Sequence, residues 1–187
     1  MPRSRASSSS GTKSHQDNEG HFQYTIGQVL NSKYTVKGFL GDGTFGRVLL
    51  VEDTEGIQKA VKVIRAVDRY VEAGKIEAEI IQKLNRADPG NESNIVKLFD
   101  HFPLGNNYCI VFEKLGKSLF DVIKANGYKG KFYVGFKITH VQQFAKQLVK
   151  SLAFMHSLGL THTDLKPENI LLVNEEMKWD EEKVIDL

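Results

Sequence analysis

Four polar side chains in the C-terminal part of the sequence have the types and the order that transfer of a phosphoryl group requires. The stretch HTDLKPENILL holds Asp164, Lys166 and Asn169, and the stretch VIDL adds Asp186. The Asp164 carboxylate can accept the proton of a hydroxyl, and the Lys166 ammonium can neutralise a transferring phosphate. Asn169 and Asp186 offer the oxygen ligands that Mg²⁺ prefers. The alternative is a polar turn after a helix, and so specific a string makes that alternative weak.

Three glycines, Gly41, Gly43 and Gly46, lie between two strand-like segments in GDGTFGRV. Without side chains, their backbone N–H groups can approach phosphates closely, so the spacing predicts a loop that covers a nucleotide. A plain hairpin turn is the simpler interpretation, and the spacing alone is weak support for more. Dinucleotide binding is disfavoured, because it needs a helix directly after the glycines and the segment VLLVED is strand-like.

Lys62 lies in the next strand-like segment, KAVKVIR, where its ammonium can reach phosphates beneath the glycine loop. A single lysine in a strand is usually a solvated charge. Glu77 follows in a helical segment and can pair with Lys62. An exposed ion pair contributes only about 0 to 1 kcal/mol to stability, so we expect this pair to position the ammonium at a phosphate.

Alternating and helical apolar patterns predict the elements that position these residues. Five strands are expected, at residues 34–40, 46–52, 58–65, 95–102 and 108–112. Three helices are expected, at residues 71–85, 118–127 and 139–157. Strands followed by helices favour the α+β class, with a five-stranded antiparallel sheet and one helix in an upper lobe and the start of a mainly helical lower lobe. The predicted divisions are a leader at residues 1–22, the upper lobe at 23–115 and a partial lower lobe at 116–187.

Composition limits the class of protein. Hydrophobic residues make up 41% and charged residues 26% of 187 residues, which suits a globular domain, and no apolar run is long enough to cross a bilayer. The Ser/Arg-rich leader is expected to be disordered, and it has no apolar core of a signal peptide, which favours a location inside the cell. Cys109 is the single cysteine, which excludes an internal disulfide. The net charge of +2 is too small to indicate nucleic-acid binding.

The motifs described above occur in the order found in the eukaryotic protein kinases, which residues 34–187 resemble. The resemblance is greater to one branch, the LAMMER or CDC-like dual-specificity kinases, in which the catalytic loop similarly reads HTDLKPENIL. Further likeness lies in VDRYVEAGKIE before Glu77, in IVFEKLGKSLFDVIK, and in an insertion before VIDL.

The resemblance implies ATP and Mg²⁺ as cofactors and gives each motif residue a role. Asp164, Lys166, Lys62 and Glu77 would be catalytic, and Asn169 and Asp186 would hold the metal. Phe112 would be the gatekeeper beside the adenine, Glu113 and Leu115 would offer hinge backbone groups, and Asp121 would lie near the ribose or the substrate entrance. The residues implied at the nucleotide are Leu40, Gly41, Gly43, Gly46, Val48, Ala60, Lys62, Phe112, Glu113, Leu115, Asp121 and Leu172.

Two departures from the kinase pattern affect the expectations. Thr163 stands where most kinases carry an arginine that pairs with a phosphorylated activation loop, which implies an enzyme not switched on by that pair. Leu187 stands where the usual phenylalanine follows the metal-binding aspartate, and the remaining lower-lobe segments are expected beyond it. We therefore expect these 187 residues alone to show little phosphorylation of peptides. Val141, Phe144, Leu148 and Leu152 of the long helix are expected to be exposed.

The resemblance implies transfer of the γ-phosphate of ATP to Ser/Thr hydroxyls of proteins, and occasionally to Tyr. It further implies Arg/Ser-rich splicing factors as substrates, a nuclear location with the cytoplasm as a second compartment, a monomer, and no nucleic-acid or membrane partner. Two alternatives stay open. The serine-arginine protein kinases share the HTD loop, although the stretch DRYVEA favours the LAMMER branch. The second alternative is that the chain is a non-catalytic ATP-binding or scaffolding fragment.

Overall fold

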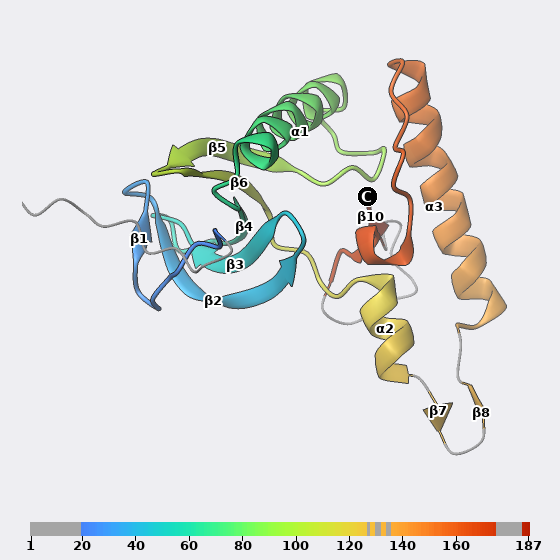
Figure 1. Cartoon of the computed structure of the whole chain (residues 1–187). Helices are drawn as coiled ribbons and strands as arrows, with labels where there is room; N and C mark the ends of the chain where they lie inside the picture. The colour runs from blue at the N-terminus through green and yellow to red at the C-terminus, as the bar shows by residue number, and fades with distance from the viewer. Residues whose placement is uncertain (1–19, 127, 130–131, 134–135, 175–184) are drawn as a thin grey trace, which may run out of the picture.

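The computed structural model describes residues 20–126, 128–129, 132–133, 136–174 and 185–187 (Figure 1). Its strands are β1 (Val29–Leu30), β2 (Tyr34–Gly43), β3 (Gly46–Glu52), β4 (Gln58–Ile64), β5 (Leu98–Leu104), β6 (Asn107–Glu113), β7 (Tyr128–Lys129), β8 (Phe132–Tyr133), β9 (Leu171–Leu172) and β10 (Ile185–Asp186). Its helices are α1 (Asp68–Ala87), α2 (Leu119–Asn126), α3 (Ile138–Ser157) and the 3₁₀ helix η1 (Pro167–Asn169). Figure 1 shows the large sheet and α1 on one side and α2 and α3 on the other, as expected for the α+β class.

The large sheet has six antiparallel strands in the order β1-β2-β3-β4-β6-β5. The expected count of five was one too low, because Val29 and Leu30 pair with Thr35 and Tyr34. A two-residue strand gives no measurable alternation in the sequence. The turn at Asn31, with φ of 47°, was the available signal, because asparagine tolerates the left-handed region that such turns need.

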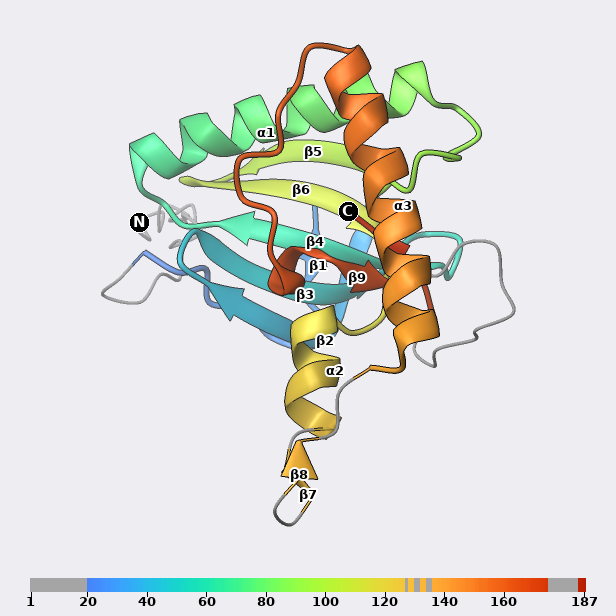
Figure 2. The same ribbon diagram turned by 90° about the vertical axis from the view of Figure 1, so that its right-hand side faces the viewer.

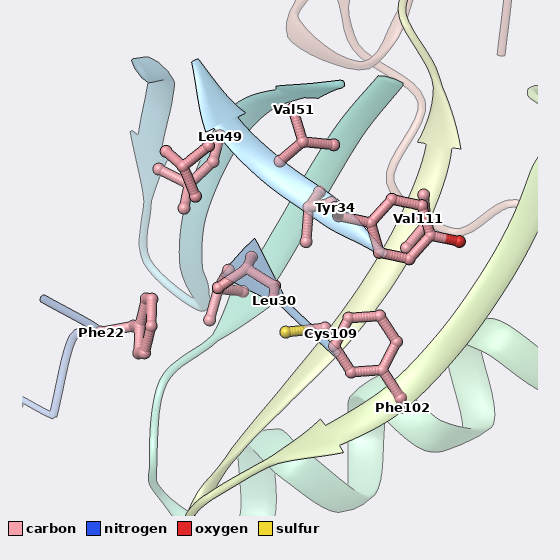
Figure 3. Packing of buried hydrophobic residues seen from close by; sticks show 11 residues of the cluster. Phe22, Leu30, Tyr34, Leu49, Val51, Phe102, Cys109 and Val111 are labelled. Carbon is pink, nitrogen blue, oxygen red and sulfur yellow. The ribbon is translucent and has the colours of Figure 1, made fainter. Parts of the chain in front are cut away.

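One face of the sheet carries the main hydrophobic core (Figure 3). Successive side chains of a strand point to opposite faces, and the buried set alternates accordingly. The buried residues of this core are Phe22, Leu30, Tyr34, Val36, Leu49, Val51, Val61, Val63, Phe102, Cys109 and Val111. Phe22, with 8% exposure, corrects the expected leader boundary: residues 20–22 are described and Phe22 packs into the core, while residues 1–19 lie outside the described part.

Helix α1 packs on the opposite face of the sheet. Its Gly74 lies so close to β4 that a Cβ there would meet Ile64 Cγ1 at 3.0 Å. Ala78 of α1 is buried with Ile64 and Ile110 in a second cluster. This contact brings the middle of α1 over the face of the sheet that carries Lys62.

The elements after β6 form the lower part of the molecule: α2, the β7–β8 pair, α3, η1 and the β9–β10 pair (Figure 2). Phe144 of α3 is 5% exposed and stacks edge-on against Phe136 at 5.1 Å between ring centroids, so its expected exposure was wrong. Val141 is 45% exposed, as expected, whereas Leu148 and Leu152 are only partly exposed, and Leu148 packs against the cluster that contains Phe144. Among the described residues, no helix is both long and apolar enough to cross a membrane.

The segment after β6 joins the two parts by running along β9. Gly116 donates its backbone N–H to the Leu172 carbonyl at 2.7 Å, and Leu172 donates to the Lys117 carbonyl at 2.9 Å. Leu119 donates to Ile170 at 2.8 Å. These bonds fix the start of α2 beside the strand that follows the HTDLKPEN loop.

Candidate active site

Lys62 projects from the middle of β4 and meets Glu77 of α1. Val48 of β3 and Ile110 of β6 lie opposite Lys62 in the sheet. Lys62 Nζ lies 2.7 Å from Glu77 Oε1 and 2.8 Å from Oε2, and the two side chains are 27% and 36% exposed. Such a half-exposed pair adds little stability, but it holds the ammonium at one place on the sheet surface.

The glycine hairpin between β2 and β3 extends the same sheet beyond Lys62. Gly41 lies opposite Val48, and Gly43 lies opposite Gly46. A Cβ on Gly46 would collide with the Val63 carbonyl of β4, so this glycine is needed for close strand packing. A Cβ on Gly41 would meet nothing within 4 Å, which leaves its backbone accessible from outside.

Phe45 forms the tip of the glycine hairpin and rests on the first turn of α1. Its ring lies 5.3 Å from the Tyr70 ring at 89°, an edge-to-face contact. Arg65 donates to the Thr44 carbonyl at 3.3 Å, and its backbone N–H donates to the Phe45 carbonyl at 2.9 Å. The hairpin tip is therefore fastened to the helix that carries Glu77.

The nucleotide residues implied by the resemblance come from both the large sheet and the lower part of the molecule. Ala60 is paired with Leu50 on one side and with Phe112 on the other, and Lys62 is paired with Val48. Ala60, Phe112 and Val48 therefore lie on the same face of the sheet as Lys62, and their side chains are partly buried. Leu40 is 44% exposed on β2. Leu172 is 2% exposed and belongs to the hydrophobic cluster of the lower part.

Glu113 and Asp121, which the resemblance also places at the nucleotide, form hydrogen bonds within the protein. Glu113, the last residue of β6, donates its N–H to the Lys97 carbonyl at 3.0 Å and accepts the Lys97 N–H on its carboxylate at 2.6 Å. Leu115 follows outside the strand. Asp121 accepts from the Ser118 hydroxyl at 2.6 Å, while the Ser118 Oγ accepts the Asp121 N–H at 3.0 Å, which is a capping arrangement at the start of α2.

The HTDLKPEN loop brings Asp164, Lys166 and Asn169 together. Lys166 Nζ lies 2.9 Å from Asp164 Oδ2, and Asn169 donates its side-chain amide to Asp164 O at 2.9 Å and to Oδ2 at 3.0 Å. The Lys166 hydrogen bond, with a smaller contribution from Asn169, lowers the pKa of the Asp164 carboxyl below its usual value. Asp164 is thus a carboxylate at neutral pH. The arrangement suits a group that orients a hydroxyl and takes its proton.

Asp186 lies beside this loop through the pairing of β10 with β9. It is paired with Leu171, two positions after Asn169, and it is fully buried. Asn169 Nδ2 donates to Asp164, and the carboxamide oxygen is the atom of Asn169 that can bind a cation. No group of three or more His, Cys, Asp or Glu side chains in the described ranges is placed to hold a metal by itself. One amide and one carboxylate fit Mg²⁺ when phosphates and water complete its shell.

Sequence reasoning missed three residues that hold the site. Gly116 is required after β6, because a Cβ there would collide with the Asn174 carbonyl. A glycine three positions after the end of β6 was the available signal. Gln147 of α3 and Asn94, in the loop before β5, bind the backbone of β10. No sequence signal indicated these two, since their partner Ile185 lies 38 and 91 residues away.

Comparisons with known proteins agree with this geometry. A family model described as "Protein kinase domain" matches residues 34–187. Serine/threonine-protein kinase AFC1 of Arabidopsis thaliana is 44% identical over 161 residues, covering 86% of this chain and 33% of that protein. Dual specificity protein kinase CLK2 of Mus musculus is 42% identical over 174 residues, covering 91% of this chain and 34% of that protein. The chain thus spans about a third of the length of these relatives.

A solved structure adds support from the fold. A crystal structure of a kinase domain superimposes with a TM-score of 0.76 at 40% sequence identity, covering 83% of this chain and 44% of that chain. The kinase-like α+β architecture expected from the sequence is therefore confirmed, apart from the additional strand β1.

Proposed function

The chain belongs to the protein kinase family, in its CDC-like (LAMMER) branch, and on that premise we propose that it binds ATP with Mg²⁺ between the large sheet and the HTDLKPEN loop. We further propose that the protein containing this chain transfers the γ-phosphate of ATP to Ser/Thr hydroxyls of proteins. The observation that carries the proposal is the pair of fixed groups: Lys62 held by Glu77 on the sheet, and Asp164 held by Lys166 and Asn169 in the loop.

Each group has a part in the proposed reaction. Lys62 binds the α and β phosphates, and the glycine hairpin covers them with backbone N–H groups. Asp164 orients the substrate hydroxyl and accepts its proton as the new oxygen–phosphorus bond forms. The bond between the γ-phosphorus and the leaving oxygen of ADP breaks in the same step. Lys166 lies 2.9 Å from Asp164 Oδ2, where its charge can stabilise the transferring group.

Asn169 and Asp186 are the residues that would hold Mg²⁺. The ion, when bound, neutralises charge on the phosphate oxygens. The chain's own contribution is to keep the two oxygen ligands close, through the short link between η1 and β9 and the pairing of β9 with β10. Hard oxygen ligands of this kind suit Mg²⁺ better than softer metals.

The substrate class and the cell compartment follow from the branch of the family. Similarity to dual specificity kinases supports transfer to tyrosine as a secondary activity. We propose Arg/Ser-rich splicing factors as substrates and the nucleus as the location, because the LAMMER resemblance implies both. A non-catalytic ATP-binding fragment is the competing function for these 187 residues, and it shares the same nucleotide site.

The proposal is tested first by nucleotide binding and then by phosphoryl transfer. Calorimetric titration of the chain with Mg·ATP should show binding that Lys62→Met weakens about tenfold. Lys37→Met is the control, because Lys37 pairs with Glu52 on β3 and not with a residue assigned to the nucleotide. Absence of nucleotide binding by the wild-type chain would refute the proposed function.

Catalysis is tested in the full-length protein. Labelled phosphate from ATP should be transferred to an Arg/Ser-rich peptide, and Asp164→Asn should reduce the rate about 10² to 10⁴-fold, the usual contribution of a positioned base. Nucleotide binding without transfer, or transfer unchanged by Asp164→Asn, would instead favour the non-catalytic function.

A further inference from the structure

The outer edge of β10 is bound by side chains that come from two distant elements. β9 pairs with one edge of β10. On the other edge, the Ile185 N–H donates to Gln147 Oε1 of α3 at 3.0 Å, and Asn94 Nδ2 donates to the Ile185 carbonyl at 3.2 Å. Both backbone polar groups of Ile185 are therefore satisfied by side-chain amides.

Leu187, on the other side of Asp186, is bound by the same loop. Its N–H donates to the Asn94 carbonyl at 3.0 Å, and its carbonyl accepts the Val96 N–H at 3.0 Å. Asn94 thus binds both neighbours of Asp186, one through its side chain and one through its backbone. The loop between α1 and β5 takes the place of a third strand beside β10.

These contacts lie in the interior, where hydrogen bonds constrain geometry most strongly. Asn94 is 4%, Gln147 is 8% and Ser151 is 0% exposed. The Ser151 hydroxyl donates to the Asn94 carbonyl at 3.3 Å, which ties the loop to α3 as well. Asn94 has φ of 56°, a left-handed conformation that asparagine tolerates better than most residues. A buried amide left without its partner is costly, so this junction has few alternative arrangements.

We propose that Gln147 and Asn94 are positioning residues for Asp186: they fix the backbone that places the carboxylate for Mg²⁺. This inference rests on the proposed function, since it assigns the two amides a role in metal-dependent nucleotide binding. They do not touch the nucleotide or the metal. Their effect passes through Ile185 and Leu187, the residues that flank the ligand.

The proposal requires that loss of either amide affect the metal-dependent part of binding. The dissociation constant for ATP is measured by calorimetry with Mg²⁺ and again with EDTA, for the wild-type chain and for Gln147→Met. Methionine has a similar volume but cannot accept the Ile185 N–H. We expect Gln147→Met to weaken binding at least tenfold with Mg²⁺ and less than twofold without it.

Asn94→Asp provides a second variant, with Asn107→Asp as a matched control. Both substitutions remove one buried amide donor: Asn94 donates to Ile185, whereas Asn107 donates to the Ile64 carbonyl at 2.7 Å in the large sheet. Ile64 lies outside the junction at β10, so Asn107→Asp should leave the Mg²⁺ effect on ATP binding unchanged. Asn94→Asp should reduce that effect about tenfold.

A readout without any ligand completes the test. Hydrogen exchange of the Ile185 and Leu187 amides in metal-free chain should accelerate in Gln147→Met and Asn94→Asp at least tenfold more than in Asn107→Asp. Equal weakening of ATP binding with and without Mg²⁺ would overturn the positioning role, as would unchanged exchange at β10. Wild-type chain that binds ATP no better with Mg²⁺ would overturn the proposed metal site itself, and the positioning role with it.

Discussion

Lys62 and Glu77 meet through both oxygens of the carboxylate, at 2.7 Å and 2.8 Å from Lys62 Nζ, although one lies on β4 and the other on α1. Gly74 and Ala78 allow α1 to pack closely on the sheet, which brings Glu77 to Lys62. The distance between Lys62 and Glu77 therefore depends on the position of α1 relative to the sheet.

Glu77→Gln should weaken binding of Mg·ATP about five- to tenfold, because the Lys62 ammonium loses its fixed position. The free energy of unfolding should change by less than about 1 kcal/mol, since the pair is half exposed. Calorimetry and urea unfolding measure the two quantities. Glu72→Gln is the control, because Glu72 pairs with Lys75 at 2.7 Å on the same helix, and it should leave ATP binding unchanged. Equal effects of both substitutions on affinity would contradict the assigned role of Glu77.

Lys166→Met should raise the pKa of Asp164 toward the ordinary value of about 3.9 for aspartate. The lowered pKa means that folding favours the carboxylate, and this contribution is present above the unfolded pKa and lost as the pH falls through the folded pKa. The pKa is measured by NMR titration of the carboxyl carbon. Asp53 serves as the internal control, because the Lys59 hydrogen bond lowers its pKa and is unaffected. An unchanged Asp164 pKa would exclude Lys166 as the main cause.

Gly46→Ala should destabilise the chain by about 1 to 3 kcal/mol, because the new methyl group would collide with the Val63 carbonyl and push β3 from β4. Gly41→Ala, in the same hairpin, should cost less than about 1 kcal/mol, because its Cβ would face open space. Urea unfolding of both variants gives the comparison. Similar losses at the two positions would show that β4 does not approach Gly46 as described.

Thr163→Asn should stabilise the chain by about 0.5 to 1 kcal/mol. Thr163 has φ of 47°, a conformation that is strained for a β-branched residue and easier for asparagine. Thr161→Asn, two positions earlier and outside the left-handed region, should give no gain. A loss of stability in Thr163→Asn, measured by thermal unfolding, would mean that the threonine side chain makes contacts worth more than the strain.

The sequence predicted the elements whose patterns are local. β3 has its expected bounds, residues 46–52, because alternating apolar residues and a glycine at its start define it. The strand expected at residues 95–102 begins instead at Leu98, because Val96 bonds to Leu187. Residues far apart in sequence determine that boundary, so no local pattern could indicate it.

The site shows the same division between local and distant information. Asp164, Lys166 and Asn169 lie within one short stretch, and their types and spacing were sufficient to predict their grouping. The pairing of Lys62 with Glu77 was expected from their charges, although they lie 15 residues apart, and the structure shows that packing of α1 on the sheet brings them together. Gln147 and Asn94 were not predicted, because a buried amide in a helix or loop has no distinctive pattern.

The proposed nucleotide and metal site is tested most directly by a crystal structure of the chain with Mg²⁺ and a non-hydrolysable ATP analogue. We expect the α or β phosphate within hydrogen-bonding distance of Lys62 Nζ, and the metal bound by Asn169 and Asp186. A nucleotide bound elsewhere would contradict the proposed site. So would phosphates that contact the sheet while the metal lies away from both Asn169 and Asp186.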